Sequence, residues 1–191
     1  GETASWEVLI VQRKYSYGFI DFMRAGKRLL DKDYILTLLH DMTTNEKISI
    51  MKKSLKELWE GIKIFKYKND HETIFNKLKR EQWFINSLTI SKSLIWEIPK
   101  GRSSYKESSI NSAIRELKEE TSIENGYNFT GIKINHIISD RGIYPVTYYL
   151  CIASDNELDN VINKKIIDGG EIKDVKWVSI DNLKSYNGGN T

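Results

Sequence analysis

The hydrophobic pattern of the first half of the chain predicts one strand followed by a group of helices. Residues 6–11 (WEVLIV) form an apolar, β-branched run between polar residues, which is typical of a buried strand. From about residue 27 to residue 93, apolar residues recur at helical spacing without a proline. The clearest stripe comprises Leu55, Leu58, Trp59 and Ile62. We therefore expect a unit of three or more short helices over residues 27–93.

The second half of the chain combines strand patterns with one amphipathic helix. Residues 94–99 (LIWEIP) predict a strand that ends at a proline. A helix is expected over about residues 105–121, where Ser104 and Glu107 have the spacing of a capping box. Three further β-branched and aromatic segments predict strands at residues 130–138, 144–153 and 174–180. Strands and helices in this mixture predict an α+β or α/β fold.

Composition and charge permit a polyphosphate or nucleic-acid partner without requiring one. The 191-residue chain has a formal net charge of +3, and 29% of its residues are charged. No apolar run approaches the roughly 20 residues that span a bilayer, so we expect a soluble, intracellular protein without membrane contact. A single cysteine, Cys151, excludes an intramolecular disulfide, and its apolar neighbours predict packing rather than nucleophilic chemistry.

Three glutamates gather on one face of the predicted helix. Glu116, Glu119 and Glu120 lie at positions i, i+3 and i+4, and like charges at this spacing cost a few tenths of a kcal/mol per pair unless a cation neutralises them. A solvated acidic face beside Lys118 is one interpretation of the cluster. The other is a site for a hard divalent cation, since Mg²⁺ and Mn²⁺ prefer carboxylate oxygens.

The sequence around these glutamates resembles the Nudix box, over residues 101–123. The matching positions are Gly101, Glu107 after five residues, Arg115-Glu116-Leu117-Lys118-Glu119-Glu120 after seven more, and Ile123. Ser122 stands where the family usually has glycine, a residue that adopts a positive φ freely. Many fixed positions within so short a segment make this pattern much more specific than a lone glycine-rich loop.

The resemblance implies a Nudix α/β/α sandwich with a mixed sheet and hydrolysis of a phosphoanhydride with Mg²⁺ or Mn²⁺, using two or more ions. It implies that Glu116, Glu119, Glu120 and the Gly101 carbonyl are metal ligands, that Glu119 and Glu120 are catalytic, and that Glu107 and Arg115 form a structural ion pair. A general base in this family often precedes a late strand. Glu171 is our candidate for it, with Asp168 and Glu157 as weaker ones, and an ordinary loop carboxylate remains the alternative for Glu171.

Flanking segments narrow the resemblance to the mRNA-decapping Nudix enzymes. Residues 96–101 (WEIPKG) resemble eukaryotic decapping enzyme 2 and its large-DNA-virus counterparts, and residues 9–22 resemble the asfarvirus and mimivirus enzymes. This resemblance implies capped mRNA as substrate, m7GDP and 5′-monophosphate RNA as products, and a cytoplasmic location, in the host if the enzyme is viral. The implied organisation is a Nudix domain in two parts, residues 1–26 and 94–191, interrupted by the helical insertion 27–93.

Substrate contacts are expected in two groups of residues. The insertion carries cations that could contact RNA, or that could simply be a solvated lysine-rich face: Lys63, Lys66, Lys68, Lys77, Lys79 and Arg80. Several aromatic residues could stack on the positively charged methylguanine, although most of them could equally belong to the core. They are Trp6, Tyr15, Tyr17, Phe19, Trp96 and Tyr144.

Two other functions remain open at this point. A diphosphoinositol polyphosphate phosphohydrolase would act on inositol pyrophosphate with the same box, and a basic surface suits such a substrate. A catalytically silent Nudix module that binds RNA is the alternative of another class. The complete glutamate set argues against the silent module, because an acidic cluster without a metal costs stability.

Overall fold

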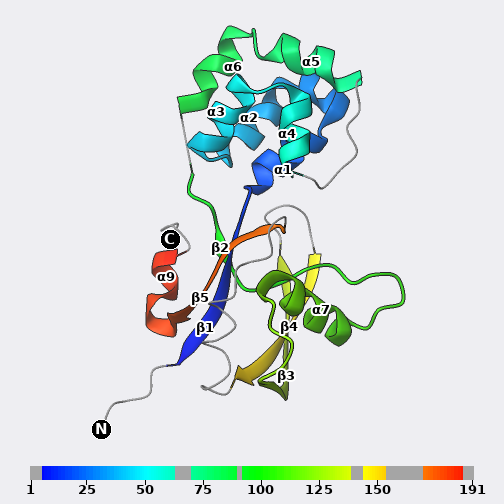
Figure 1. Ribbon diagram of the computed structural model, residues 1–191, viewed down its shortest axis with the longest axis vertical. Helices are drawn as coiled ribbons and strands as arrows, with labels where there is room; N and C mark the ends of the chain where they lie inside the picture. The colour runs from blue at the N-terminus through cyan, green and yellow to red at the C-terminus, as the bar shows by residue number, and fades with distance from the viewer. Residues whose placement is uncertain (1–5, 63–69, 90–91, 139–143, 154–169, 187–191) are drawn as a thin grey trace. The chain divides into compact units, whose positions relative to one another are not determined.

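The computed structural model of this chain describes residues 6–62, 70–89, 92–138, 144–153 and 170–186 (Figure 1). Its elements are the strands β1 (Glu7–Arg13), β2 (Trp96–Glu97), β3 (Tyr127–Ile138), β4 (Tyr144–Ala153) and β5 (Ile172–Ser179); the α-helices α1 (Tyr17–Arg24), α2 (Lys32–His40), α3 (Thr44–Lys52), α4 (Leu55–Ile62), α5 (Asp70–Leu78), α6 (Gln82–Asn86), α7 (Ser109–Thr121) and α9 (Leu183–Tyr186); and the 3₁₀ helices η1 (Gly26–Leu30), η2 (Ser87–Thr89) and η3 (Ile180–Asn182). None of the described helices is long and apolar enough to cross a membrane.

The chain divides into two compact units, which we describe separately. Gly1–Gln12 and Trp96–Gly189 form one, here called the sheet unit, and Arg13–Ile95 form the other, here called the helical unit. The combination of helices and sheets agrees with the predicted fold class. Residues 13–26, however, belong to the helical unit, whereas we expected them with the first strand.

The helical unit is built around one aromatic core. Phe22 lies with its ring centroid 6.2 Å from that of Phe75 and 6.3 Å from that of Phe84. Helix α1 buries Phe19, Ile20, Phe22 and Met23 in this core. Burial of these side chains explains why the unit begins before residue 27, because an apolar helix face is stable only against a partner.

A buried carboxylate joins the first turns of two helices in this unit. Glu46 is 6% exposed and accepts hydrogen bonds from Ser16 N at 2.6 Å, Ser16 Oγ at 2.7 Å and Thr43 N at 2.8 Å. Ser16 is the N-cap of α1 and Thr43 the N-cap of α3, where Thr43 and Glu46 form a capping box. One side chain therefore satisfies backbone donors at two helix starts.

Glu46→Ala is expected to lower the free energy of unfolding by about 3 kcal/mol, because the buried Ser16 N–H and the partly buried Thr43 N–H both lose their acceptor. Glu57 makes the same kind of capping contact to Ser54, at 2.7 Å from Oε2 to the backbone N, but at an exposed helix start. Glu57→Ala is the matched control and should cost much less. Urea denaturation measures both changes, and equal losses would contradict the cross-helix role of Glu46.

The sheet unit contains two sheets among its described strands. One has the order β2-β1-β5, and β1 pairs with β2 antiparallel through Val11 with Glu97 and Gln12 with Trp96. The other is the antiparallel β3–β4 hairpin, in which the register shifts between Phe129 and Lys133. All predicted strands are confirmed in type and approximate position. Strand β2 is shorter than the predicted 94–99 segment, and Pro99 lacks the N–H that would extend its ladder.

Helix α7 begins four residues later than the predicted start at residue 105. Its N-cap is Ser108, whose side chain accepts from Asn111 N at 3.3 Å. The Ser104–Glu107 pair closes a turn before the helix instead, since Ser104 N donates to Glu107 Oε2 at 2.8 Å. Lys106 between them has φ 64°, a left-handed conformation that cannot continue a helix. The expected capping box is therefore wrong, although its hydrogen bond is present.

The residue that departs from the Nudix box has the backbone conformation of a glycine. Ser122, the C-cap of α7, has φ 62° and ψ 15°, and its N–H donates to Lys118 O at 2.8 Å. Such a left-handed residue commonly ends a helix, and glycine adopts this conformation without the steric cost of a Cβ atom.

Ser122→Gly is expected to raise the free energy of unfolding by about 0.5–1 kcal/mol, because it removes the strain of a left-handed L residue. Asn111→Gly, at an exposed position within the same helix, should change stability in the opposite direction. Urea midpoints of the two variants test this. A destabilised Ser122→Gly protein would show that the serine side chain stabilises the helix end.

Candidate metal-binding and hydrolytic site

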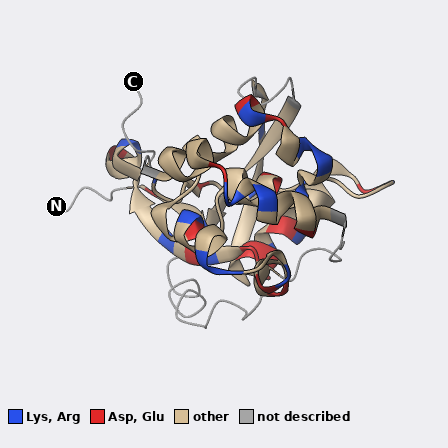
Figure 2. Cartoon of the chain, turned by 90° about the horizontal axis from the view of Figure 1, so that it is seen from above, with Lys and Arg blue, Asp and Glu red and all other residues tan. Residues whose placement is uncertain are grey.

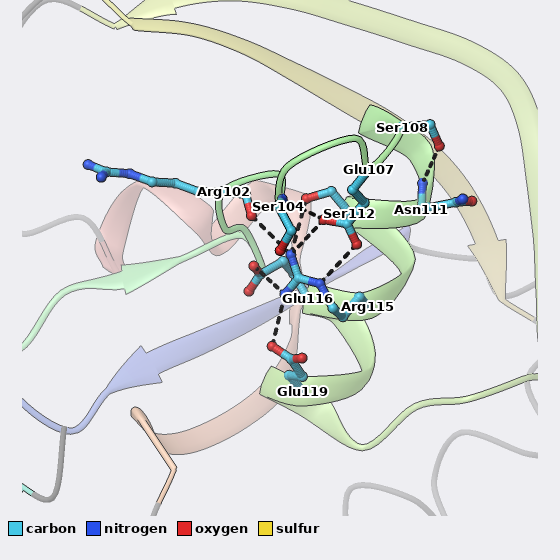
Figure 3. A network of polar contacts seen from close by, with 9 residues as sticks. All are labelled: Arg102, Ser104, Glu107, Ser108, Asn111, Ser112, Arg115, Glu116 and Glu119. Atoms are coloured by element: carbon cyan, nitrogen blue, oxygen red, sulfur yellow. Dashed lines mark hydrogen bonds and ion pairs between the residues drawn. The ribbon is translucent and has the colours of Figure 1, made fainter.

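Arg115 connects the acidic helix to the loop that precedes it (Figure 3). Its Nε and Nη2 donate to the two oxygens of Glu107 at 3.0 and 3.1 Å, and Nη2 also donates to the Arg102 carbonyl at 2.9 Å. Its Nη1 donates to Glu116 Oε1 at 2.7 Å and to Glu119 Oε2 at 3.0 Å. One guanidinium thus fixes the loop and neutralises part of the acidic face.

Gly101 leaves space for the carboxylate of Glu116. A Cβ atom at residue 101 would overlap the Glu116 Cδ and both of its carboxylate oxygens. The Glu116 side chain is only 15% exposed, so it has little room to move away. Glycine therefore lets the backbone of the loop lie directly against a carboxylate of the helix, and any larger residue would displace that carboxylate.

The third glutamate is held by the backbone of the same loop. Lys100 N donates to Glu120 Oε2 at 2.9 Å. The Lys100 ammonium forms an ion pair with Glu97 on β2. Sequence reasoning did not identify these two positions as part of the site. Their signal was the WEIPKG segment itself, which places a charged pair and a backbone donor directly before Gly101.

The chemical nature of the candidate ligands, carboxylates and a backbone carbonyl, suits a hard divalent cation. Three carboxylates beside a backbone carbonyl are the ligands that Mg²⁺ and Mn²⁺ prefer. In the present arrangement Glu116 and Glu119 bond to Arg115, and no group of three acidic, histidine or cysteine side chains in the described part of the chain converges on one point. Glu119 has a side chain that is 57% exposed and can rotate away from Arg115. The types of ligand therefore suit a divalent metal, whereas in this arrangement Arg115 holds both Glu116 and Glu119.

The loop-to-helix ion pair is strengthened by hydrogen bonding on both sides. Hydrogen bonds from Arg115, and then from Ser104 N, hold the pKa of Glu107 below its usual range. Hydrogen bonds to Glu107 and Glu116 raise the pKa of Arg115. A lowered carboxylate pKa stabilises the fold above the unfolded-state value, and this contribution is lost as the pH falls through the folded-state value. The ion pair between Glu107 and Arg115 should therefore be intact at neutral pH and be lost only in acid.

Arg115→Lys is expected to lower hydrolytic activity by about 10–100-fold, the usual cost of losing a residue that orients metal ligands. Lysine keeps the charge but cannot bond Glu107, Glu116 and Glu119 from one planar group. Arg102→Lys is the control, because only the carbonyl of Arg102 takes part in the network. Steady-state kinetics on a common substrate measure both variants. Unchanged activity of Arg115→Lys would contradict the positioning role.

The candidates for a general base are only partly described. Glu171 lies directly before β5 and is exposed. Asp168 and Glu157 lie outside the described residues. Burial raises the pKa of the Cys151 thiol, in agreement with the expectation that this cysteine packs rather than reacts.

The predicted RNA-contacting cations divide into those that are exposed and those that are not. Lys77 and Arg80 are exposed at the end of α5. Lys79 instead donates from Nζ to the Lys53 carbonyl at 2.9 Å, and burial lowers its pKa. Lys63, Lys66 and Lys68 lie outside the described residues. Figure 2 shows lysine and arginine residues distributed over several helices rather than along one.

The aromatic candidates for cap stacking lie in both units. Trp6 is 67% exposed, whereas Phe19 is 2% exposed in the helical core and is therefore unavailable for stacking. Tyr15 packs against Phe19 and donates to Gly61 O at 3.1 Å. Two further candidates already contact cations: the ring centroid of Tyr17 lies 4.6 Å from the Arg13 guanidinium carbon, and that of Trp96 lies 3.9 Å from Lys176 Nζ. The side chain of Tyr144 is not described.

A glycine loop packed on an acidic helix, with an arginine that joins the two, is the arrangement that the Nudix box implies. The chain belongs to the NUDIX domain family, which matches residues 78–190. Among characterised proteins it is similar to the mRNA-decapping protein g5R of African swine fever virus. The Warthog/Namibia isolate is 30% identical over 135 residues, which cover 63% of this chain and 54% of the relative. The Pig/Kenya isolate is 30% identical over 131 residues, which cover 61% and 52%. The chain thus spans about half the length of these relatives.

Proposed function

We propose that this Nudix hydrolase removes the 5′ cap of mRNA, releasing m7GDP and 5′-monophosphate RNA, with Mg²⁺ or Mn²⁺ as cofactor. The observation that carries this proposal is the acidic face of α7, fixed against the loop at Gly101 by Arg115. The similarity to mRNA-decapping proteins of African swine fever virus supports capped RNA as the substrate.

Three roles in the proposed reaction would belong to different residues: binding the metal ions, positioning the ligands and accepting a proton. Glu116, Glu119, Glu120 and the Gly101 carbonyl would hold the metal ions, which neutralise phosphate oxygens and make a water molecule more acidic. Glu107 and Arg115 would position these ligands. Glu171 would accept the proton of the attacking water, whose oxygen joins one phosphorus as the P–O bond of the anhydride breaks.

Metal binding would require a change of partner at Glu119. Its carboxylate now accepts from Arg115 Nη1 at 3.0 Å, and a bound cation would compete with the guanidinium for it. Glu116 would keep its place against Gly101, because the loop leaves it little space. Arg115 would retain Glu107 and the Arg102 carbonyl, so the loop would stay attached to the helix.

Substrate recognition would use surfaces outside the box. The exposed cations Lys77 and Arg80 would contact RNA phosphates, together with Lys63, Lys66 and Lys68. The described aromatic candidates for stacking on the methylated base are those that are at least partly exposed, namely Trp6, Tyr15, Tyr17 and Trp96. A cytoplasmic location would follow from an mRNA substrate.

The test is the product released from RNA that carries a radiolabel in its cap. Incubation with Mg²⁺ or Mn²⁺ should release labelled m7GDP, resolved by thin-layer chromatography. The same protein is then given an inositol pyrophosphate at equal concentration. Absence of m7GDP, or a far higher turnover of the inositol pyrophosphate, would overturn the proposal in favour of the other phosphohydrolase. Absence of both products would favour a silent binding module.

A further inference from the structure

A charged pair joins the short strand β2 to the loop of the candidate metal site. The Lys100 ammonium donates to Glu97 Oε2, and the side chains of Glu97 and Lys100 are 11% and 33% exposed. Glu97 is therefore largely withdrawn from water, while Lys100 remains partly open to it. An ion pair taken out of water contributes little net stability, because the cost of desolvation offsets the attraction. Stability of the loop is thus a weak explanation for this pair.

The backbone of Lys100 lies at the acidic face of α7. Lys100 N donates to Glu120 Oε2 at 2.9 Å, and the next residue, Gly101, lies directly against the Glu116 carboxylate. Two of the candidate metal ligands therefore meet the loop where the side chain of Lys100 begins. The Lys100 ammonium can reach no farther from this point than the length of its own side chain. A phosphate chain held at these glutamates would thus lie close to that ammonium.

The cations that contact α7 or its loop differ in how firmly they are held. The Arg115 guanidinium is fixed between the loop and three glutamates. Lys118 pairs with Glu124 at the exposed end of the helix. Lys100 instead carries a point charge on a flexible four-carbon stem, and its three donors allow it to contact a second oxygen while it keeps the first. Lysine binds phosphate groups in this manner.

We propose that Lys100 binds a non-bridging oxygen of the substrate's phosphate chain, and that Glu97 positions its ammonium and limits the strength of this contact. The ammonium would keep Glu97 on one donor and offer another to the phosphate. The negative charge of Glu97 would weaken the attraction for phosphate, so that a diphosphate product leaves more readily after cleavage. This inference rests on the phosphoanhydride chemistry of the proposed function and not on the cap.

Calorimetric titration of the full chain at a fixed excess of Mg²⁺ tests the contact, with two probes that resist hydrolysis: methylenediphosphonate and a cap dinucleotide with methylene bridges between its phosphorus atoms. Lys100→Gln should weaken binding of both about tenfold, as expected for the loss of one hydrogen bond from a charged donor. Lys100→Arg keeps the charge and should stay within about threefold. Lys118→Gln, the control, removes an exposed charge from α7 and should stay within about twofold. Unchanged binding by Lys100→Gln would overturn the proposal, as would an unmodified chain that binds neither probe.

Substitution of Glu97 distinguishes a phosphate contact from a purely structural ion pair. Glu97→Gln keeps an oxygen that can accept from Lys100 but removes the charge that competes with phosphate, so it should tighten probe binding by about threefold. A purely structural pair predicts weaker binding for either single variant, because each leaves one charge without its counter-charge. The double variant, with both residues changed to glutamine, should bind as weakly as Lys100→Gln. Weaker binding by Glu97→Gln, or binding restored in the double variant, would contradict the proposal.

Two results separate this inference from the proposed function. Binding of methylenediphosphonate that depends on Lys100, in a protein that releases no m7GDP from capped RNA, would refute decapping and leave the phosphate contact in place. Release of m7GDP by a protein whose probe binding does not depend on Lys100 would refute only the contact. Urea midpoints check that each variant is folded. If Lys100→Gln does not fold, the double variant replaces it, because it leaves no unpaired charge at the pair.

Discussion

Glu120→Gln is expected to lower the rate of cap hydrolysis by about 10²–10³-fold, a loss similar to that from removing one group that stabilises the charge of a transition state. The substitution is nearly isosteric, and the amide oxygen can still accept the hydrogen bond that Lys100 N now donates to Glu120 Oε2 at 2.9 Å. The loop should therefore stay in place while one negative charge is removed. Any loss of rate then reports on the charge, which a metal ligand needs and a purely structural acceptor does not.

Single-turnover kinetics on cap-labelled RNA, at saturating Mg²⁺, measure this effect. Glu124→Gln is the matched control, because Glu124 is exposed just beyond the same helix and its Oε1 forms an exposed ion pair with Lys118 Nζ at 3.0 Å. Its rate should stay within about twofold of the unmodified chain, as for most exposed ion pairs. A Glu120→Gln enzyme with full activity would contradict the metal assignment of this residue.

Gly101→Ala is expected to reduce activity by about 10²-fold or more, because displacing a catalytic group by about 1 Å can cost that much. The new methyl group would overlap the Glu116 carboxylate, which must then leave its position and its contact with Arg115 Nη1. One added carbon would therefore disturb a metal ligand and the positioning arginine together. The effect should fall mainly on the rate and on metal affinity.

Gly61→Ala provides the control for an added methyl group. Gly61 lies in α4, and apart from its chain neighbours and its own helix backbone no atom of the described residues lies within 4 Å of the position of a Cβ, so alanine should fit and stabilise the helix by about 0.5–1 kcal/mol. Circular dichroism should show the same secondary structure for both variants. Activity is then titrated with Mg²⁺. Gly101→Ala with unchanged rate and unchanged metal requirement would show that Glu116 does not need its place against the loop.

The sequence predicted those features that depend on local pattern. Apolar alternation located the strands, and the spacing of Glu116, Glu119 and Glu120 placed three carboxylates on one helix. The Glu107–Arg115 ion pair was expected from the resemblance to the Nudix box, and in the structure Arg115 Nε lies 3.0 Å from Glu107 Oε1. Such features are accessible because helix periodicity and a specific motif each fix relative positions over a few residues.

Features that depend on tertiary contacts were not predictable in the same way. The start of the helical unit at residue 13 depends on burial of α1 in an aromatic core that also includes Phe75 and Phe84, far along the chain. Helix α7 starts at Ser109 because Lys106 is left-handed, and no local rule identifies lysine for that conformation. The buried side chain of Lys47 ends the polar segment 43–47 (TTNEK), which in sequence is indistinguishable from a solvated helix start.

The most direct test of the metal assignment is the binding of Mn²⁺ to α7, measured by electron paramagnetic resonance on chelator-treated protein. The unmodified chain should bind Mn²⁺ and release m7GDP from capped RNA only after the metal is restored. A variant with Glu116, Glu119 and Glu120 all changed to glutamine should bind at least about tenfold more weakly, since metal affinity depends on ligand charge. Binding of Mn²⁺ by this variant with the affinity of the unmodified chain would contradict the central claim.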